Sequence, residues 1–215
     1  MIGARPLTDQ EVNKVLAEGF TGQFKHRNQS FFALGISTGF RTAELLALLM
    51  RDVMHRKYPR EFVKIRRKHT KGKAQGRTQR VYPFAQDALQ PWIDERLDDT
   101  DLADLLDQPV FISRERDTRT GQIQPITTQH ASHILASAFN RCDITGSVST
   151  HSMRKTFAKK AYEDAVRKFK NDEILMEPLR VVQKQLGHKT IQSTLNYLSF
   201  IGSDADPDLF QFTGQ

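Results

Sequence analysis

Five side chains in this sequence could act together on a phosphate ester: Arg41, His151, Arg154, His188 and Tyr197. His151 and Arg154 are three residues apart, so a helix would place both on one face. Taken alone, His188 could be a helix cap and Tyr197 an aromatic residue at the edge of the core. The rest of the chain decides between these interpretations.

The chemistry that these residues suit is nucleophilic attack on a phosphodiester. Two arginines can clamp the non-bridging oxygens, and fixed cations there stabilise the charge of a pentavalent transition state. A tyrosine hydroxyl, with a pKa of about 10, needs nearby cations or a base such as His151 before it can attack. His188 could donate a hydrogen bond to the phosphate. Such a reaction needs no metal and no nucleotide cofactor, so we expect neither.

The leaving 5′-oxygen would also need a proton. A lysine beside two arginines could supply it, because neighbouring positive charge lowers the pKa of the ammonium group. The stretch TKGK, residues 70–73, offers lysines of this kind. A phosphotyrosine ester would conserve the energy of the broken bond, so the reaction could run backwards onto another strand.

Positive charge is concentrated in one segment of the chain. Residues 55–80 hold eleven lysines and arginines and a single acid, Glu61, whereas the net charge of the whole chain is +7. A run of charge is usually a solvated face, but this run exceeds what solubility requires. Concentrated cations suit a phosphate backbone, so we predict a nucleic acid as the partner.

The composition excludes several classes of protein. With 38% hydrophobic and 27% charged residues over 215 positions, the chain can form one ordinary domain or two small ones. No apolar run approaches the roughly 18–20 residues of a membrane helix, and the first ten residues lack a signal-peptide pattern. Cys142 is the single cysteine, which excludes an internal disulfide and a cysteine-based zinc cluster. We therefore expect a cytoplasmic, nucleoid-associated protein with no membrane contact.

The periodicity predicts an α+β fold that is mostly α-helical, with a small antiparallel sheet or hairpin near residues 61–84. The pattern TDQE at 8–11 predicts a capped helix start. The stretch 41–53 predicts a helix with Leu45, Leu48 and Leu49 on one face. β-branched and aromatic residues on both sides of KHTKGKAQGRT predict a hairpin with a long basic tip.

The second half of the chain is predicted to be largely helical. A helix should follow the hairpin, with Leu89, Trp92, Ile93 and Leu97 facing inward. PVFIS then indicates a short strand, and RERDTRTGQIQP indicates a polar loop. From Thr127 onward every segment up to Phe200 favours helix.

Three segments, taken in order, resemble the catalytic domain of the tyrosine recombinases, which include phage-type integrases and Xer-type resolvases. They are TGFRTAELLAL, HSMRKTFA and LGHKTIQSTLNYLS, and the basic hairpin lies between the first and the second. The resemblance extends over nearly the whole chain, from about Leu7 to Phe200. It implies site-specific DNA recombination, in which strands are cut and rejoined through a 3′-phosphotyrosine by four protomers on double-stranded DNA.

The resemblance implies a role for each matching residue. Arg41 and Arg154 look like the paired phosphate-binding arginines. His151 looks like the histidine of the family's His-x-x-Arg motif, and His188 looks like that of its Leu-Gly-His motif. Tyr197 looks like the nucleophile that joins to DNA.

Supporting residues follow from the same resemblance. Glu44 looks like the acidic residue after the first arginine, which supports the site without reacting. The family's lysine lies in a turn between two strands, where Lys71 and Lys73 both fit and Lys68 is possible; we choose Lys71 as the general acid. The basic residues around it are expected to bind DNA: Arg66, Arg67, Lys68, Lys73 and Arg77.

We expect residues 1–200 to form the catalytic domain and residues 201–215 to form a tail. Most family members carry an N-terminal core-binding domain, which we expect to be absent here, through truncation or by nature. In the second case a partner recombinase or accessory protein would complete the DNA clamp. Leu209, Phe210 and Phe212 could anchor the tail on a neighbouring protomer or on its own chain.

Two other functions stay open. One is topoisomerase-like relaxation, which uses the same chemistry without synapsis of two sites. The other is an accessory factor that binds DNA and regulates a host recombinase. The presence of Tyr197 argues against the second, because a purely regulatory protein has no use for the nucleophile.

Overall fold

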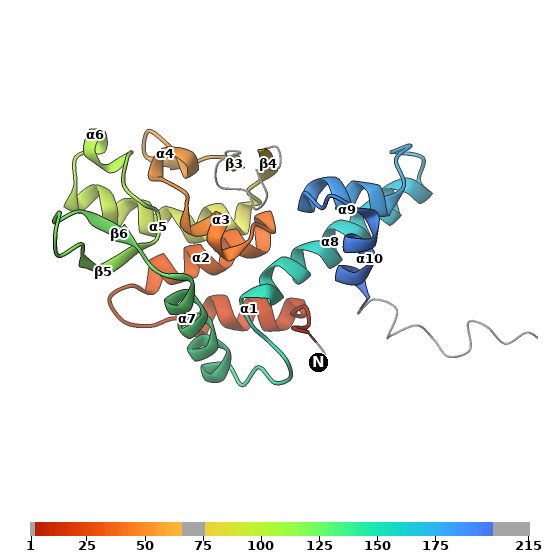
Figure 1. Cartoon of the computed structure of the whole chain (residues 1–215), viewed down its shortest axis with the longest axis horizontal. Coiled ribbons are helices and arrows are strands. Elements are labelled where there is room, and N and C mark those ends of the chain that lie inside the picture. The colour runs from red at the N-terminus through yellow and green to blue at the C-terminus, as the bar shows by residue number, and fades with distance from the viewer. Residues whose placement is uncertain (1–2, 66–75, 200–215) are drawn as a thin grey trace, which may run out of the picture. The chain divides into compact units, whose positions relative to one another are not determined.

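The computed structural model describes residues 3–65 and 76–199 (Figure 1). Its internal contacts divide the chain into two compact units, which meet in sequence between Phe157 and Ala158. This boundary falls inside the long helix α8 (Thr150–Lys170). The first turns of α8 therefore belong to the first unit and the remaining turns to the second.

The first unit combines helices with short antiparallel strand pairs, so the predicted α+β, mostly helical class is confirmed. Its helices before α8 are α1 (Asp9–Glu18), α2 (Lys25–Thr38), α3 (Thr42–Leu46), α4 (Met50–Val53), α5 (Pro83–Asp99), α6 (Leu102–Leu105) and α7 (Thr128–Arg141). Its strands pair as β1 (Met54–His55) with β2 (Tyr58–Pro59), β3 (Phe62–Ile65) with β4 (Arg77–Arg80), and β5 (Ile112–Arg116) with β6 (Ile123–Pro125).

The core of this unit is built around α2. The run FFALGI is apolar on all sides, and a helix of this kind must be enclosed by other elements. Phe31, Phe32 and Leu34 are accordingly buried, and α2 packs most extensively along α5. The Phe31 ring meets the edge of Phe111 at a centroid distance of 5.2 Å. This packing fixes the C-terminal end of α2, from which part of the site is built.

Several predicted elements are confirmed. Thr8 and Glu11 form the predicted capping box at the start of α1. The predicted hairpin pairs β3 with β4, and Phe62 lies opposite Arg80. The helix α5 continues through Pro91, and it buries Leu89, Trp92 and Ile93.

The prediction of a single helix over residues 41–53 is wrong. The chain forms two short helices, α3 and α4, separated by an extended stretch at Leu48 and Leu49. There the backbone forms hydrogen bonds with another segment of the chain and not within a helix. The Val110 N–H donates to the Leu48 carbonyl at 3.0 Å, and Leu49 forms a β-bridge with Pro109. Tertiary pairing with the segment Pro109–Val110, which precedes β5, has overridden the helical pattern. Leu45 and Leu48 are nevertheless buried, as predicted.

The predicted polar loop at residues 114–125 is also wrong. This segment forms most of the hairpin β5–β6. Asp117 organises the turn, since its carboxylate accepts hydrogen bonds from the backbone N–H groups of Arg119 and Thr120 at 2.9 and 2.7 Å. An Asp in this role is a local turn signal that competes with a loop interpretation.

The second unit holds the later turns of α8, then α9 (Pro178–Leu186) and α10 (Ile191–Leu198), so the predicted helical character is confirmed (Figure 1). Pro178 occupies the first turn of α9, and Gly187 ends that helix in the left-handed conformation, with φ 66°. Thr190 then caps α10 through a hydrogen bond to the Ser193 N–H. The short linker between these two signals packs α9 against α10.

Among the described ranges, 3–65 and 76–199, no helix has the length and apolar character required to cross a membrane.

Candidate active site

The first predicted site residue, Arg41, is held at the start of α3. Gly39 ends α2 with φ 60°, and Arg41 then occupies the N-cap position of α3. The backbone N–H of Arg41 donates to Glu44 Oε2 at 2.7 Å, and its Nη1 donates to Glu44 Oε1 at 3.1 Å. The side chain of Arg41 is 34% exposed. Its guanidinium is therefore oriented by a carboxylate and still accessible to a phosphate.

Glu44 is the centre of a buried cluster of charge. Its side chain is 2% exposed and lies between Arg41 and Arg77. Arg77 donates from Nη2 to Oε2 at 2.6 Å and from Nη1 to Oε1 at 3.2 Å. Burial alone would raise the pKa of Glu44, but the hydrogen bonds and charge of Arg77, with a smaller contribution from Arg41, hold that pKa below its ordinary value. Glu44 is thus held in its ionised form by the two arginines.

The structure places Arg77 beside Glu44. We predict a DNA contact for this residue, but its side chain is only 10% exposed and is paired with Glu44. Its guanidinium also lies 5.0 Å from the Phe40 ring centroid. In this structure the guanidinium of Arg77 is therefore engaged by Glu44 and Phe40, and its contact with DNA stays a prediction.

Arg154 lies on the first turns of α8 and is 3% exposed. Its Nη1 donates a hydrogen bond to the carbonyl oxygen of Gly39. Gly39 is two residues before Arg41 in sequence, so the turn that positions the first arginine also binds the second. The structure therefore brings these two predicted residues to one place.

Close packing of helices makes this meeting possible. A Cβ at Gly35 would lie 2.5 Å from Met153 Sδ, and a Cβ at Gly39 would overlap the ring of Phe157. Both contacts press the start of α8 against the end of α2. The glycines are thus needed for close approach, and Gly39 is needed for its positive φ as well.

Replacing Gly39 with alanine should lower the free energy of unfolding by about 3 kcal/mol, because strain at positive φ adds to a clash with Phe157. Gly121→Ala is a matched control: its φ is 69°, and a Cβ there would have no neighbour within 4 Å. It should cost about 1 kcal/mol, the conformational part alone. Urea unfolding of both variants measures the difference, and equal losses would show that packing at Gly39 is unimportant.

His151 lies one turn before Arg154 on α8 and is exposed. Partial desolvation, together with repulsion from Arg154, Lys155 and Arg41, lowers the pKa of its imidazole. His151 and Arg154 are three residues apart on α8, so both lie on one face of that helix. A histidine with a lowered pKa is neutral at pH 7, the form that accepts a proton.

In the second unit, His188 and Tyr197 lie side by side. Gly187 turns the chain out of α9, and His188 Nδ1 lies 3.1 Å from the buried Thr194 Oγ1 on α10. The rings of His188 and Tyr197 meet edge to face, with centroids 5.4 Å apart and planes at 72°. The two predicted residues are thus neighbours, nine positions apart in sequence.

The basic tip of the hairpin lies outside the described residues. This applies to the predicted general acid and to most of the predicted DNA-binding residues: Arg66, Arg67, Lys68, Lys71 and Lys73. The tail at residues 201–215 also lies outside them. The structure does describe the two strands on either side of this segment, in which Ile65 and Arg77 are paired with each other.

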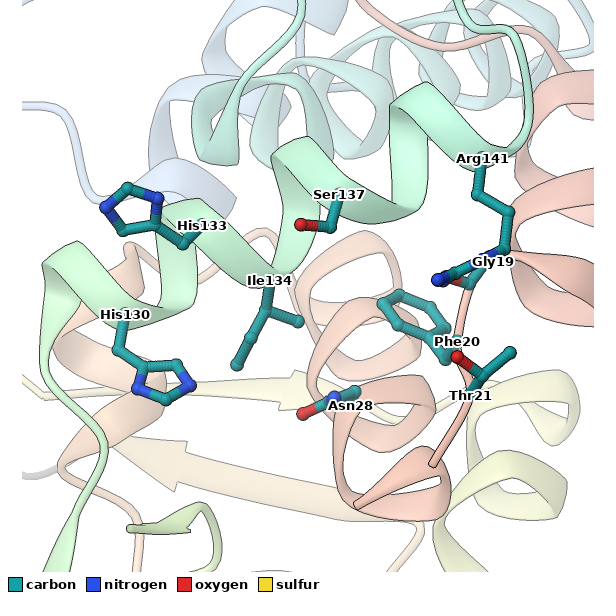
Figure 2. Close-up of a pocket in the computed structure, with 9 residues that line it drawn as sticks. All are labelled: Gly19, Phe20, Thr21, Asn28, His130, His133, Ile134, Ser137 and Arg141. Atoms are coloured by element: carbon teal, nitrogen blue, oxygen red, sulfur yellow. The ribbon is translucent and has the colours of Figure 1, made fainter. Parts of the chain in front are cut away.

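A separate pocket opens between α7 and the segment from Gly19 to Asn28, with a volume of about 280 Å³. His130, Ile134 and Ser137 project from α7 there, and Asn28 lies opposite (Figure 2). Partial burial, then repulsion from Arg27 and His133, lowers the pKa of His130. The pocket shares no residue with the site described above.

Solved structures share this fold. The XerA recombinase superposes with a TM-score of 0.66 at 18% identity, over 95% of this chain and 66% of its own. An integrase of the Tn1549 transposon, solved in complex with a circular intermediate DNA, gives 0.63 at 16%, over 90% and 61%. A lambda integrase dimer bound to a COC′ core site gives 0.54 at 16%, over 96% and 51%. The chain thus spans about two thirds or less of these proteins.

No curated protein matches the sequence significantly. The sequence pattern of the phage integrase family, by contrast, matches residues 5–200. This range contains every residue of the clusters around Glu44 and Tyr197, and the chain therefore belongs to the phage integrase family.

Proposed function

We propose that this protein cuts and rejoins DNA strands in site-specific recombination, through a covalent link between Tyr197 and a DNA 3′-phosphate. The observation that carries the proposal is the joining of Arg41 and Arg154 at one turn. Arg154 binds the carbonyl of Gly39. Arg41, two residues after Gly39, is held by Glu44. Two guanidinium groups at one place suit the two non-bridging oxygens of a phosphodiester.

The reaction that we propose consists of two successive transesterifications at the same phosphorus atom. The Tyr197 oxygen attacks phosphorus, and its proton passes to His151. The bond from phosphorus to the 5′-oxygen breaks, and Lys71 gives that oxygen a proton. Arg41 and Arg154 stabilise the charge on the pentavalent phosphorus. In the second exchange a 5′-hydroxyl of another strand gives its proton to Lys71 and attacks the phosphotyrosine. The bond from phosphorus to the Tyr197 oxygen breaks, and His151 returns a proton to that oxygen.

The edge-to-face contact of His188 and Tyr197 supports a shared role for the pair. Thr194 Oγ1 lies 3.1 Å from Nδ1 of His188 and so helps to orient the imidazole, which we propose donates a hydrogen bond to the phosphate. We propose that the residues of the two clusters, Arg41 and Arg154 in the first unit and His188 and Tyr197 in the second, act on the same phosphate.

DNA as the partner is supported by the basic segment at 55–80 and by relatives that were solved on DNA. We further propose that four protomers assemble on two DNA sites, in the cytoplasm at the nucleoid. Residues 201–215 are proposed to contact a neighbouring protomer, and a partner protein is proposed to complete the grip on DNA.

The rate of strand cleavage should fall at acid pH, because the proposed base His151 must be neutral. Its lowered pKa means that the neutral form persists to below pH 6.5 and is lost as pH falls further. The rate of single-turnover cleavage, measured between pH 5 and 8, should fall on the acid side. The His151→Gln variant should cleave more slowly, and its rate should no longer fall at acid pH. An unchanged acid limb in His151→Gln would assign the titration to another group.

The test of the proposed function begins with nicked DNA duplexes of random sequence around the nick. A strand cut near a nick loses its short 5′-hydroxyl fragment, so the covalent complex accumulates and its DNA can be sequenced. The recovered site is then placed twice in one supercoiled plasmid. Recombined circles would support the proposal, and relaxed circles without recombination would indicate a topoisomerase. DNA binding with neither product would indicate an accessory factor.

A further inference from the structure

Arg77 is the one member of the Glu44 cluster that the proposed reaction leaves without a role. It begins β4, on the other side of Glu44 from Arg41. Both of its Nη groups bond the carboxylate, at 2.6 and 3.2 Å, and it faces the ring of Phe40. A planar fork of this kind fixes the plane of a carboxylate more firmly than a single point charge can.

Stability alone does not account for this arrangement. A buried ion pair is weak evidence for stability, since the cost of removing both charges from water offsets their attraction. Here Arg77 Nε is also buried without a hydrogen-bond acceptor among the residues that the structure describes. Such groups are uncommon in proteins. The pair therefore resembles a support for a functional group more than an optimised core contact.

The function that it supports is the placement of Arg41. Glu44 Oε1 accepts from Arg41 at 3.1 Å and from Arg77 at 3.2 Å, and Oε2 accepts from the Arg41 backbone and from Arg77. Each oxygen is thus shared. Without Arg77, only Arg41 would hold the carboxylate. The carboxylate could then turn to pair with the Arg41 guanidinium through both oxygens, which would withdraw that group from the phosphate.

We propose that Arg77 is a positioning residue that orients Arg41 through Glu44. This inference rests on the proposed function, because it assigns Arg41 to the phosphate. Arg77 also follows the lysine-bearing stretch 68–73 in sequence and is paired with Ile65. The ion pair of Arg77 with Glu44 therefore connects β4, the strand that follows the lysines in sequence, to α3, the helix whose N-cap residue is Arg41.

The test compares Arg77→Lys and Arg77→Gln with the wild type in single-turnover cleavage and in DNA affinity. Loss of orientation should slow cleavage by up to about 10²-fold in the glutamine variant, with DNA affinity unchanged. Arg77→Lys should be intermediate, since it keeps the charge but loses the fork. Arg96→Gln is the control: Arg96 is likewise buried, 5.5 Å from the Trp92 ring centroid, and lies outside the cluster. Its cleavage rate should be unchanged.

A double-variant experiment separates positioning from a direct role. If Arg77 acts through Arg41, adding Arg77→Gln to Arg41→Lys should slow cleavage much less than it slows the wild type. Full additivity of the two losses would overturn the proposal, and so would a loss in Arg96→Gln as large as that in Arg77→Gln.

A second readout does not depend on catalysis. The Nε–Hε resonance of Arg41, assigned by its disappearance in Arg41→Lys, should shift or broaden in Arg77→Gln and stay in place in Arg96→Gln. If the wild type fails to cleave DNA, the proposed function fails, and this spectrum still decides the positioning. An Arg41 resonance that is unchanged in Arg77→Gln would overturn the proposal by itself.

Discussion

Replacing Tyr197 with phenylalanine should abolish covalent attachment to DNA and slow strand cleavage by at least about 10⁴-fold. The change removes only the hydroxyl oxygen, so the edge-to-face packing on His188, with centroids 5.4 Å apart, is retained. Neither the fold nor the arginine cluster of the first unit should change. DNA affinity should therefore stay that of the wild type, and the loss should appear in the chemical step.

Tyr162→Phe is the matched control for this prediction. Tyr162 lies on α8 and, like Tyr197, is partly buried. Its variant should cleave at the wild-type rate and form the usual adduct. If Tyr197→Phe still forms an SDS-stable adduct at a comparable rate, Tyr197 is not the nucleophile.

Replacing Arg154 with lysine should slow cleavage by about 10²- to 10³-fold, the usual cost of removing one fixed donor to a developing negative charge. Lysine keeps the positive charge, but it cannot bind the Gly39 carbonyl and two phosphate oxygens in one plane. Because the site is buried, some loss of stability is also expected, about 1–3 kcal/mol. The measurement is single-turnover cleavage at a temperature where urea titration shows the variant to be folded.

Two comparisons make this result interpretable. Lys159→Ala removes a partly exposed charge from the same helix and should leave the cleavage rate unchanged. Gly39→Ala displaces the carbonyl that Arg154 binds, so it should slow cleavage in the same direction. An Arg154→Lys variant with the wild-type rate would exclude this residue from transition-state binding.

The candidate site residues can be identified from the sequence more directly than the short elements around them. The candidate residues belong to short motifs with recognisable spacing, and local helix-capping preferences position them. These residues are Arg41, His151, Arg154, His188 and Tyr197. Gly187 and Thr190, for example, end one helix and begin the next by their own conformational preferences. The placement of His188 opposite Tyr197 follows from this short turn.

The break between α3 and α4 could not be predicted in the same way. The leucines at 45, 48 and 49 have helical spacing, and only the pairing of Leu48 with Val110 explains why the helix stops. That contact joins segments far apart in the chain. Long-range pairing of this kind leaves no periodic signal at either partner.

The role of Arg77 was within reach of the sequence. Along β4 and the next residue the side chains alternate: Gln79 and Val81 are buried, whereas Arg80 is exposed. Arg77 is two residues before Gln79 and four before Val81, so the alternation of side chains along a strand places it on the same inner face. The density of positive charge around it outweighed this signal in the prediction of a DNA contact.

The central claim, a covalent bond between Tyr197 and DNA, can be tested by mass spectrometry of the trapped complex. Trypsin cuts after Lys189, and no lysine or arginine follows, so residues 190–215 form one peptide with Tyr197 as its only tyrosine. After nuclease digestion of wild-type protein trapped on nicked DNA, the account predicts a nucleotide 3′-phosphate on Tyr197 in this peptide. A nucleotide on any other residue, or no adduct on a DNA that the protein binds, would contradict it.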